Sequence, residues 1–225
     1  MTGKTHRAGG MLCCFIGYSI LQQKGLLVKD VNPLLQATVM YPFALWGSTM
    51  SDLDHHAESA PSKDIISVCI NRVLHLTTNA RKVNPNIDKF GILDAKHRSW
   101  QTHSFEFLAM FIYLFYQCVF VLQQTNNVII LRMVTAGLTL GVISHIILDM
   151  LTPEGIWCIL FVITNKVTNS KLPEKIHIVP KSKFFATDGP WEKLIRVVLW
   201  VANFIYLLYL IYLVSPYRIT FDFMG

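Results

Sequence analysis

The chain has 225 residues, of which 52% are hydrophobic and only 15% are charged, and its formal net charge at pH 7 is +6. A soluble domain carries about 25% charged residues, so the composition favours a membrane protein over a soluble enzyme. The basic residues are interleaved with acidic ones between apolar runs, which is typical of a membrane protein and disfavours nucleic acid as a partner. No linker-like or low-complexity tract divides the chain, so we expect one membrane-embedded domain over residues 1–225.

Five apolar runs predict an all-α fold, a polytopic membrane helical bundle of about four to five helices. The first two runs, residues 8–21 and 34–50, are short and contain glycine or proline. They are compatible with tilted spans, with a re-entrant hairpin and with helices packed inside the bundle. The later runs, residues 105–122, 128–151 and 194–214, each approach the roughly 20 residues that cross a bilayer.

The order of the runs brings the polar clusters to one side of the membrane. If the first two runs form a hairpin, the residues just before the first and just after the second emerge together, and the short connection QQTNN returns the chain to that side. The segments 57–96 and 165–193 carry most of the Lys and Arg, so the positive-inside tendency places this side in the cytoplasm. We therefore expect a multi-pass cell-membrane protein whose polar clusters face the cytoplasm. The alternating stretch KIHIVPKSKFF predicts a short extended hairpin before the last helix.

The stretch SHIILDMLTPEG places a histidine and an aspartate four residues apart near the end of an apolar run. On a helix, His145 and Asp149 share one face with Cβ atoms about 6 Å apart, so both side chains can reach a common atom. Pro153 and Gly155 are expected to end the helix just beyond them. The pair fits a two-ligand contribution to a metal site, and it also fits a plain buried hydrogen bond.

Three further clusters are expected on the same side. SDLDHH, at residues 51–56, offers two aspartates and two histidines, of which a helix cap would account for one residue. HRSWQTHS, at residues 97–104, offers two histidines and an arginine beside a tryptophan that would suit a membrane interface. THRAGG, near the start of the chain, adds one histidine. The candidate ligands are therefore His6, Asp52, Asp54, His55, His97, His103, His145 and Asp149.

Imidazoles and carboxylates without cysteine suit zinc, manganese or iron in a hydrolytic site better than a structural zinc. The set is large enough for two metal ions, or for one ion with carboxylates that orient the imidazoles. A bound metal would make a water molecule nucleophilic near neutral pH, and Arg98 would stabilise the negative charge that develops, for example on a phosphoryl group. His75 and His177 fit structural roles, and Glu192 fits a helix cap, with a role beside the metal as the alternative.

With these residues in place, the chain resembles the YdjM-like family of inner-membrane, metal-dependent hydrolases, some of which are described as LexA-binding. The resemblance covers nearly the whole chain and rests on THRAGG, SDLDH, HRSWQTHS, GVISHIILDMLTPEGI and TDGPWEK in that order. It implies site roles for the candidate residues above, for Arg98, for Thr102 and for Pro153. The H-x-x-x-D pair is also similar to the pair in zinc-dependent phospholipase C and P1-type nucleases.

We therefore predict a metal-dependent hydrolase-like domain that cleaves a phosphoester or lipid-like substrate at the cytoplasmic membrane boundary, with zinc as the preferred metal and manganese or iron as alternatives. Three residues are assigned to catalysis: Asp52, Arg98 and Thr102. The remaining candidates are assigned to the metal: His6, Asp54, His55, His97, His103, His145 and Asp149. Three alternatives stay open: a metal site that only staples helices or senses metal, a transport path along His145 and Asp149, and a membrane adaptor that binds a cytosolic regulator through the basic loop 57–96.

Overall fold

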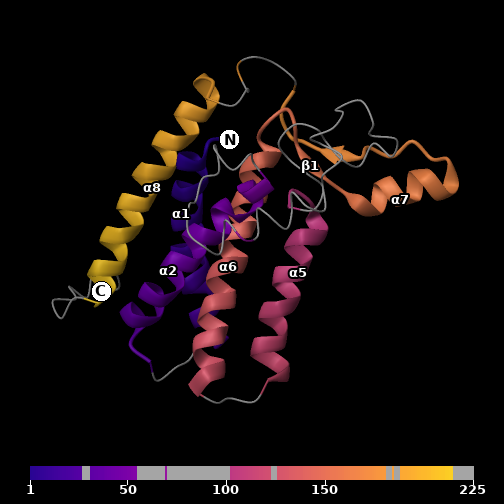
Figure 1. Ribbon diagram of the computed structural model, residues 1–225. Helices are drawn as coiled ribbons and strands as arrows, with labels where there is room; N and C mark the ends of the chain where they lie inside the picture. The colour runs from indigo at the N-terminus through magenta and orange to yellow at the C-terminus, as the bar shows by residue number, and fades with distance from the viewer. Residues whose placement is uncertain are drawn as a thin grey trace, which may run out of the picture.

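The computed structural model describes residues 1–26, 31–54, 69, 102–122, 126–180, 184 and 188–214, without the side chains of residues 33, 34, 53, 54, 126, 127, 213 and 214. These residues are mostly helical, as the sequence predicts (Figure 1). The α-helices are α1 (Gly3–Gln23), α2 (Pro33–Met50), α5 (Phe105–Tyr116), α6 (Asn126–Met150), α7 (Ile159–Thr168) and α8 (Pro190–Val214). A 3-10 turn, η1 (Ser51–Asp54), continues α2, and a π-helical turn, η2 (Gln117–Val121), continues α5.

Helix α6 lies at the centre of a bundle in which it contacts α1, α2 and α5, while α8 packs on the outside against α1 (Figure 1). The closest pair is α2 with α6, because glycines let the two backbones approach. A Cβ atom at Gly137 or Gly141 would collide with a backbone carbonyl of α2, and one at Gly47 would collide with a carbonyl of α6. Small residues at a helix crossing are typical of helix pairs packed inside membranes.

Two described helices are long and apolar enough to cross a membrane, Val128–Met150 in α6 and Pro190–Tyr212 in α8. The apolar helix at Phe105–Val121, predicted as a third clear span, is shorter and reaches only about 25 Å at 1.5 Å per residue. Helices α1 and α2 pack against each other and against α6, which matches the interpretation of the first two runs as helices inside the bundle. A bundle of four to five spanning helices is therefore not confirmed.

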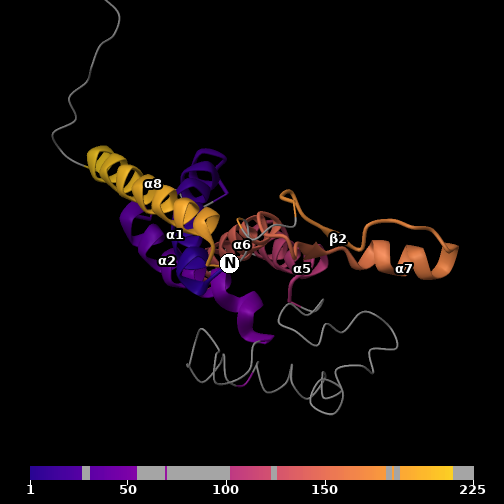
Figure 2. The ribbon, with the colours of Figure 1, turned by 90° about the horizontal axis from the view of Figure 1, so that it is seen from above.

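The extended segment before the last helix is present, but its pairing differs from the prediction. Strand β2 (Lys175–Ile176) pairs antiparallel with β1 (Ile156–Trp157), which directly follows α6, in the register Ile156 to Ile176. A small two-stranded sheet is therefore present, but the partner strand lies upstream, with α7 between the two. The second half of KIHIVPKSKFF lies mostly outside the described residues, so a hairpin inside this stretch stays a prediction. Seen from above in Figure 2, α7 extends sideways from the bundle.

Candidate metal centre

Four segments that are far apart in the sequence bring five acidic and imidazole side chains together at one end of the bundle. His6 lies in the first turn of α1, Asp52 in η1, and His103 directly before α5. His145 and Asp149 lie in the last two turns of α6. All five are buried, with at most 3% of each residue exposed. The predicted hairpin of the first two runs is the feature that delivers His6 and Asp52 to the same place.

The distances between these side chains are those of donors around a common centre. His145 Nε2 lies 3.2 Å from Asp149 Oδ2 and 3.8 Å from Asp52 Oδ1. His103 Nε2 lies 3.5 Å from Asp52 Oδ1 and 3.6 Å from Asp149 Oδ2, and His6 Nε2 lies 3.4 Å from Asp149 Oδ1. Bonds of about 2.1 Å in a tetrahedron put two ligand atoms about 3.4 Å apart. The observed spacing therefore fits a small divalent cation.

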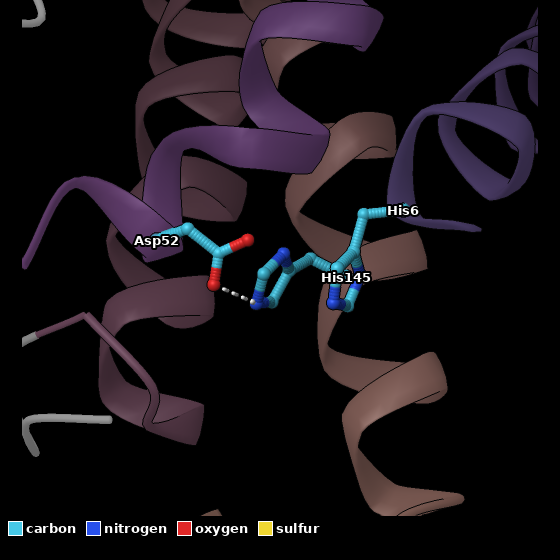
Figure 3. A group of neighbouring side chains, drawn as sticks. All are labelled: His6, Asp52 and His145. Carbon is cyan, nitrogen blue, oxygen red and sulfur yellow. Dashed lines mark ion pairs between the residues drawn. The ribbon is translucent and has the colours of Figure 1, made fainter. Parts of the chain in front are cut away.

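Two overlapping groups of three residues have ligand atoms that all lie within 4.8 Å of one another. One group is His6, Asp52 and His145, and the other is His103, His145 and Asp149. Figure 3 shows the first group, with the Asp52 carboxylate directed at the His145 ring and the His6 ring beside it. Because His145 belongs to both groups, the cluster can hold one ion with several possible ligands or two ions that share a site.

The tautomer of His145 can be assigned from its surroundings. Its Nδ1 lies 2.7 Å from the backbone carbonyl oxygen of Ser48, which only accepts, so Nδ1 must carry a hydrogen and donate it. In the neutral ring, Nε2 then presents a lone pair toward the two carboxylates, and it has no hydrogen-bond partner among the described residues. Histidines that ligate metals are oriented in this way by a hydrogen bond to the other ring nitrogen.

His6 is also in the form that a metal requires. Burial lowers the pKa of His6 to about 4, with the neighbouring His145 and the chain's α-amino group adding to the shift, so the ring is neutral at pH 7. Its ring stacks on that of His145, with centroids 3.8 Å apart and planes 13° from parallel. Neither ring nitrogen of His6 has a hydrogen-bond partner within the described ranges. A buried imidazole in this state is a good candidate for a ligand.

Asp52 is held in its ionised form. Burial alone would raise the pKa of Asp52, but His145, the contact with His103 and His6, when these rings carry a proton at acidic pH, outweigh burial and keep this pKa well below its usual range. The carboxylate is the form that binds a cation. The α-amino group of Met1 lies 3.1 Å from Asp149 Oδ1, the same oxygen that His6 approaches.

Contacts around the cluster fix the orientation of its members. Thr102 Oγ1 lies 3.1 Å from His103 Nδ1, and the His103 carbonyl accepts a hydrogen bond from the Trp157 amide of β1. On α8, the Glu192 carboxylate accepts hydrogen bonds of 2.6 Å from the Thr2 amide and from the hydroxyls of Thr2 and Thr5, the residue before His6.

The structure describes some of the predicted site residues and leaves others outside its described ranges. The structure brings together His6, Asp52, His103, His145 and Asp149, and it places Thr102 against His103. The backbone of Asp54 continues η1, but its side chain is outside the described part of the structure. Three more predicted site residues, and with them three assigned roles, lie outside the described residues: His55, His97 and Arg98.

Some contacts that hold the cluster in place have little or no signal in the sequence. For Glu192 the sequence predicts a helix cap, with a role beside the metal as the alternative. The side chain does accept a hydrogen bond from the Asp188 amide just before α8, and its other oxygen accepts from Thr2 and Thr5. Ser48, whose carbonyl orients His145, has no side-chain signal at all because the contact is made by the backbone. The only available signal for Glu192 was the acidic residue inside the motif TDGPWEK.

Residues 1–219 match a family model described as YdjM inner membrane protein. The chain belongs to the YdjM family. This confirms the resemblance drawn from the five sequence blocks, and the membership agrees with the two apolar helices that can cross a membrane. The chain matches no curated protein and no solved structure.

Proposed function

We propose that the chain is a membrane-bound, metal-dependent hydrolase whose centre is the buried cluster at the end of α6. The observation that supports this proposal most strongly is the convergence of three histidines and two aspartates from four separate segments at metal-ligand spacing. Burying this many ionisable groups is costly unless they are paired or coordinate a cation. A hydrogen-bonded pair of His145 and Asp149 alone would leave His6, His103 and Asp52 without a reason to meet there.

The chain's own residues divide into ligands and helpers under this proposal. His6, His103, His145 and Asp149 offer donor atoms to the ion, together with the predicted ligands His55, His97 and Asp54. Asp52 contacts both His103 and His145 and can act as a ligand or take a proton from the attacking water. Thr102 positions His103 through its ring nitrogen. Arg98 keeps its proposed role of stabilising negative charge on the substrate.

A divalent cation bound here would supply Lewis acidity and lower the pKa of a coordinated water molecule. The donors in the described cluster are imidazole nitrogens and carboxylate oxygens, a set that suits zinc, manganese and iron. Zinc is our first choice because spacing near 3.4 Å corresponds to its short bonds and low coordination number.

The location of the cluster indicates the class of substrate. His145 and Asp149 lie in the last turns of a helix long enough to cross a membrane, which supports a centre at a membrane boundary. A molecule with its tail in the bilayer and its headgroup at that depth would reach the centre most directly. We therefore propose a lipid or another amphipathic phosphoester as the substrate, approached from the cytoplasmic side of a multi-pass protein.

The complete burial of the described cluster favours one alternative, a metal site that staples helices or senses metal without catalysis. Structural sites are closed by protein ligands, whereas catalytic sites keep a position open for water. The two functions differ in one measurable respect: a catalytic site must exchange water at the bound ion.

Hydrolysis by reloaded protein tests the proposal. Protein purified in detergent, stripped with a chelator and reloaded with zinc, manganese or iron should release phosphate ester products from a synthetic phosphodiester or from phosphatidylglycerol. The Asp52→Asn variant should lose activity by about 100-fold or more if Asp52 serves as the base. His177→Ala, at an exposed histidine outside the cluster, is the matched control. Retained metal with no hydrolysis of any ester would support the structural or sensory alternative instead.

A further inference from the structure

Helix α7 exposes a stripe of large apolar side chains. Leu160, Ile163 and Val167 are 64%, 52% and 77% exposed. At 3.6 residues per turn, these three positions fall within an arc of about 60°. The only buried residue of α7 is Val162, which lies about 100° from the nearest residue of the stripe. One face of α7 is therefore buried, and another face exposes an apolar surface.

The helix lies across the axis of the bundle and beside the end that holds the metal-ligand cluster. Figure 1 shows α7 crossing the direction of α5 and α6 near the end of α6, and Figure 2 shows it pointing away from the bundle. A helix that crosses the spanning direction at a membrane boundary has the orientation of an interfacial helix.

Backbone hydrogen bonds fix α7 to the cluster end of the bundle. The Cys158 amide donates to the Glu174 carbonyl, and the pairing of β1 with β2 closes the loop that contains α7. The Ile178 amide then donates to the carbonyl of Met150, the residue after Asp149. The position of α7 relative to the centre is therefore set by the fold.

The polar groups of this arm, residues 159–180, suit a negatively charged surface of lipid. The arm contains three lysines and one acidic residue, Glu174. Lys166 lies about 60° beyond Ile163, at the edge of the stripe, where a lysine can reach headgroups while its stem lies on apolar surface. The hydroxyls of Thr164 and Thr168 donate to carbonyls one turn earlier in α7, which leaves no free donor on them.

We propose that α7 is an interfacial helix that inserts Leu160, Ile163 and Val167 into the leaflet next to the cluster, with Lys166 of α7 and Lys171 just after it on anionic lipid headgroups. The chain belongs to an inner-membrane protein family, so a bilayer is the expected surroundings of α7. The proposal depends neither on a bound metal nor on hydrolase activity. Because the arm is fixed to Met150 and to β1, insertion of α7 sets the depth of the cluster at the headgroup layer.

Spin labels on single cysteines test this placement. Labels at Ile163→Cys and, as the matched control, at the exposed Thr168→Cys on another face of α7 would be attached in a chain whose five native cysteines are replaced by alanine. The protein would be reconstituted in vesicles of phosphatidylethanolamine with anionic phosphatidylglycerol. We expect the label at 163 to be several-fold less accessible to an aqueous nickel chelate, and more accessible to oxygen, than the label at 168.

Changing the lipid charge, and measuring spin-spin broadening between chains, provide further tests. In vesicles of phosphatidylcholine alone, or with Lys166→Gln and Lys171→Gln, the label at 163 should lie measurably closer to water. Equal exposure of both labels to the nickel chelate would overturn the proposal. Strong spin-spin broadening between labels at 163 would also overturn it, because the stripe would then be covered by a second copy of the chain. Unchanged helical content by circular dichroism shows that each labelled variant is folded.

Discussion

The imidazole of His145 is oriented by the backbone of another helix, since its Nδ1 donates to the Ser48 carbonyl at the end of α2. The sequence could predict that His145 and Asp149 share a face, because that follows from the helical repeat alone. It could not predict Ser48, or the bonds of Glu192 to Thr2 and Thr5, because contacts between residues so far apart in the chain leave no local pattern. The ligand types and Thr102, which contacts His103, were therefore accessible from sequence, whereas the Ser48 carbonyl that orients His145 was not.

Glu192→Gln tests the importance of these orienting contacts. The carboxylate accepts bonds from Thr2 and Thr5 on one oxygen and from Asp188 on the other, whereas a glutamine keeps only one acceptor oxygen. We expect a loss of about 1–3 kcal/mol in the free energy of unfolding, and weaker metal binding because His6 follows Thr5. Thermal unfolding in detergent and a metal titration measure the two effects.

The control for this change is Glu174→Gln, at an exposed glutamate in the arm that contains α7. It should leave both stability and metal binding as in the unmodified protein. If Glu192→Gln behaved like this control, the link between α8 and the start of α1 would not position His6.

At the scale of elements, the predicted helices are present, and the misses come from short segments. The runs at 128–151 and 194–214 correspond to α6 and α8. They were predictable because an apolar run of this length indicates a helix in any surroundings. Helix α7 and the strand at Ile156–Trp157 were not predicted, because an apolar segment of this length fits a helix and a strand equally well. The pairing of β1 with β2 is a tertiary contact that local alternation does not specify.

Gly141→Ala tests whether close packing of α2 on α6 supports the site. The new Cβ would collide with the Ala44 carbonyl and the Ser48 amide, so the helices must move apart. We expect a cost of about 1–3 kcal/mol from overpacking, and weaker metal binding because the Ser48 carbonyl would shift away from His145. Ile147→Ala, at an exposed position of the same helix, should have a much smaller effect on metal binding. Equal metal affinity in the two variants would contradict the coupling.

At the scale of the molecule, the described residues place the metal-ligand cluster at one end of the bundle and an apolar surface along its outer helix. Helix α8 exposes large apolar side chains along its length, among them Val197, Phe204 and Ile211, as a helix in contact with lipid should. Composition alone predicted a membrane protein, and the family membership agrees. The cytoplasmic orientation stays a prediction from the Lys and Arg content of residues 57–96 and 165–193.

Labelling with a membrane-impermeant maleimide tests that orientation. In a Cys69→Ser background, a cysteine replacing Lys171 lies at the cluster end of the bundle, and a cysteine replacing Gln23 lies at the end of α1 on the opposite side. We expect the cysteine at 23 to react in cells whose outer membrane is permeabilised and whose inner membrane is intact. The cysteine at 171 should react only after the inner membrane is also opened. The reverse pattern would place the cluster outside the cytoplasm.

The metal content of the purified protein tests the central claim most directly. Elemental analysis of detergent-purified chain should find about one to two equivalents of zinc, manganese or iron, in keeping with two overlapping ligand groups that share His145. The His145→Ala, Asp149→Ala double variant should lose this metal, while His177→Ala should retain it. Absence of metal from all three folded proteins would contradict the account, since the cluster would then be a network of buried hydrogen bonds and ion pairs.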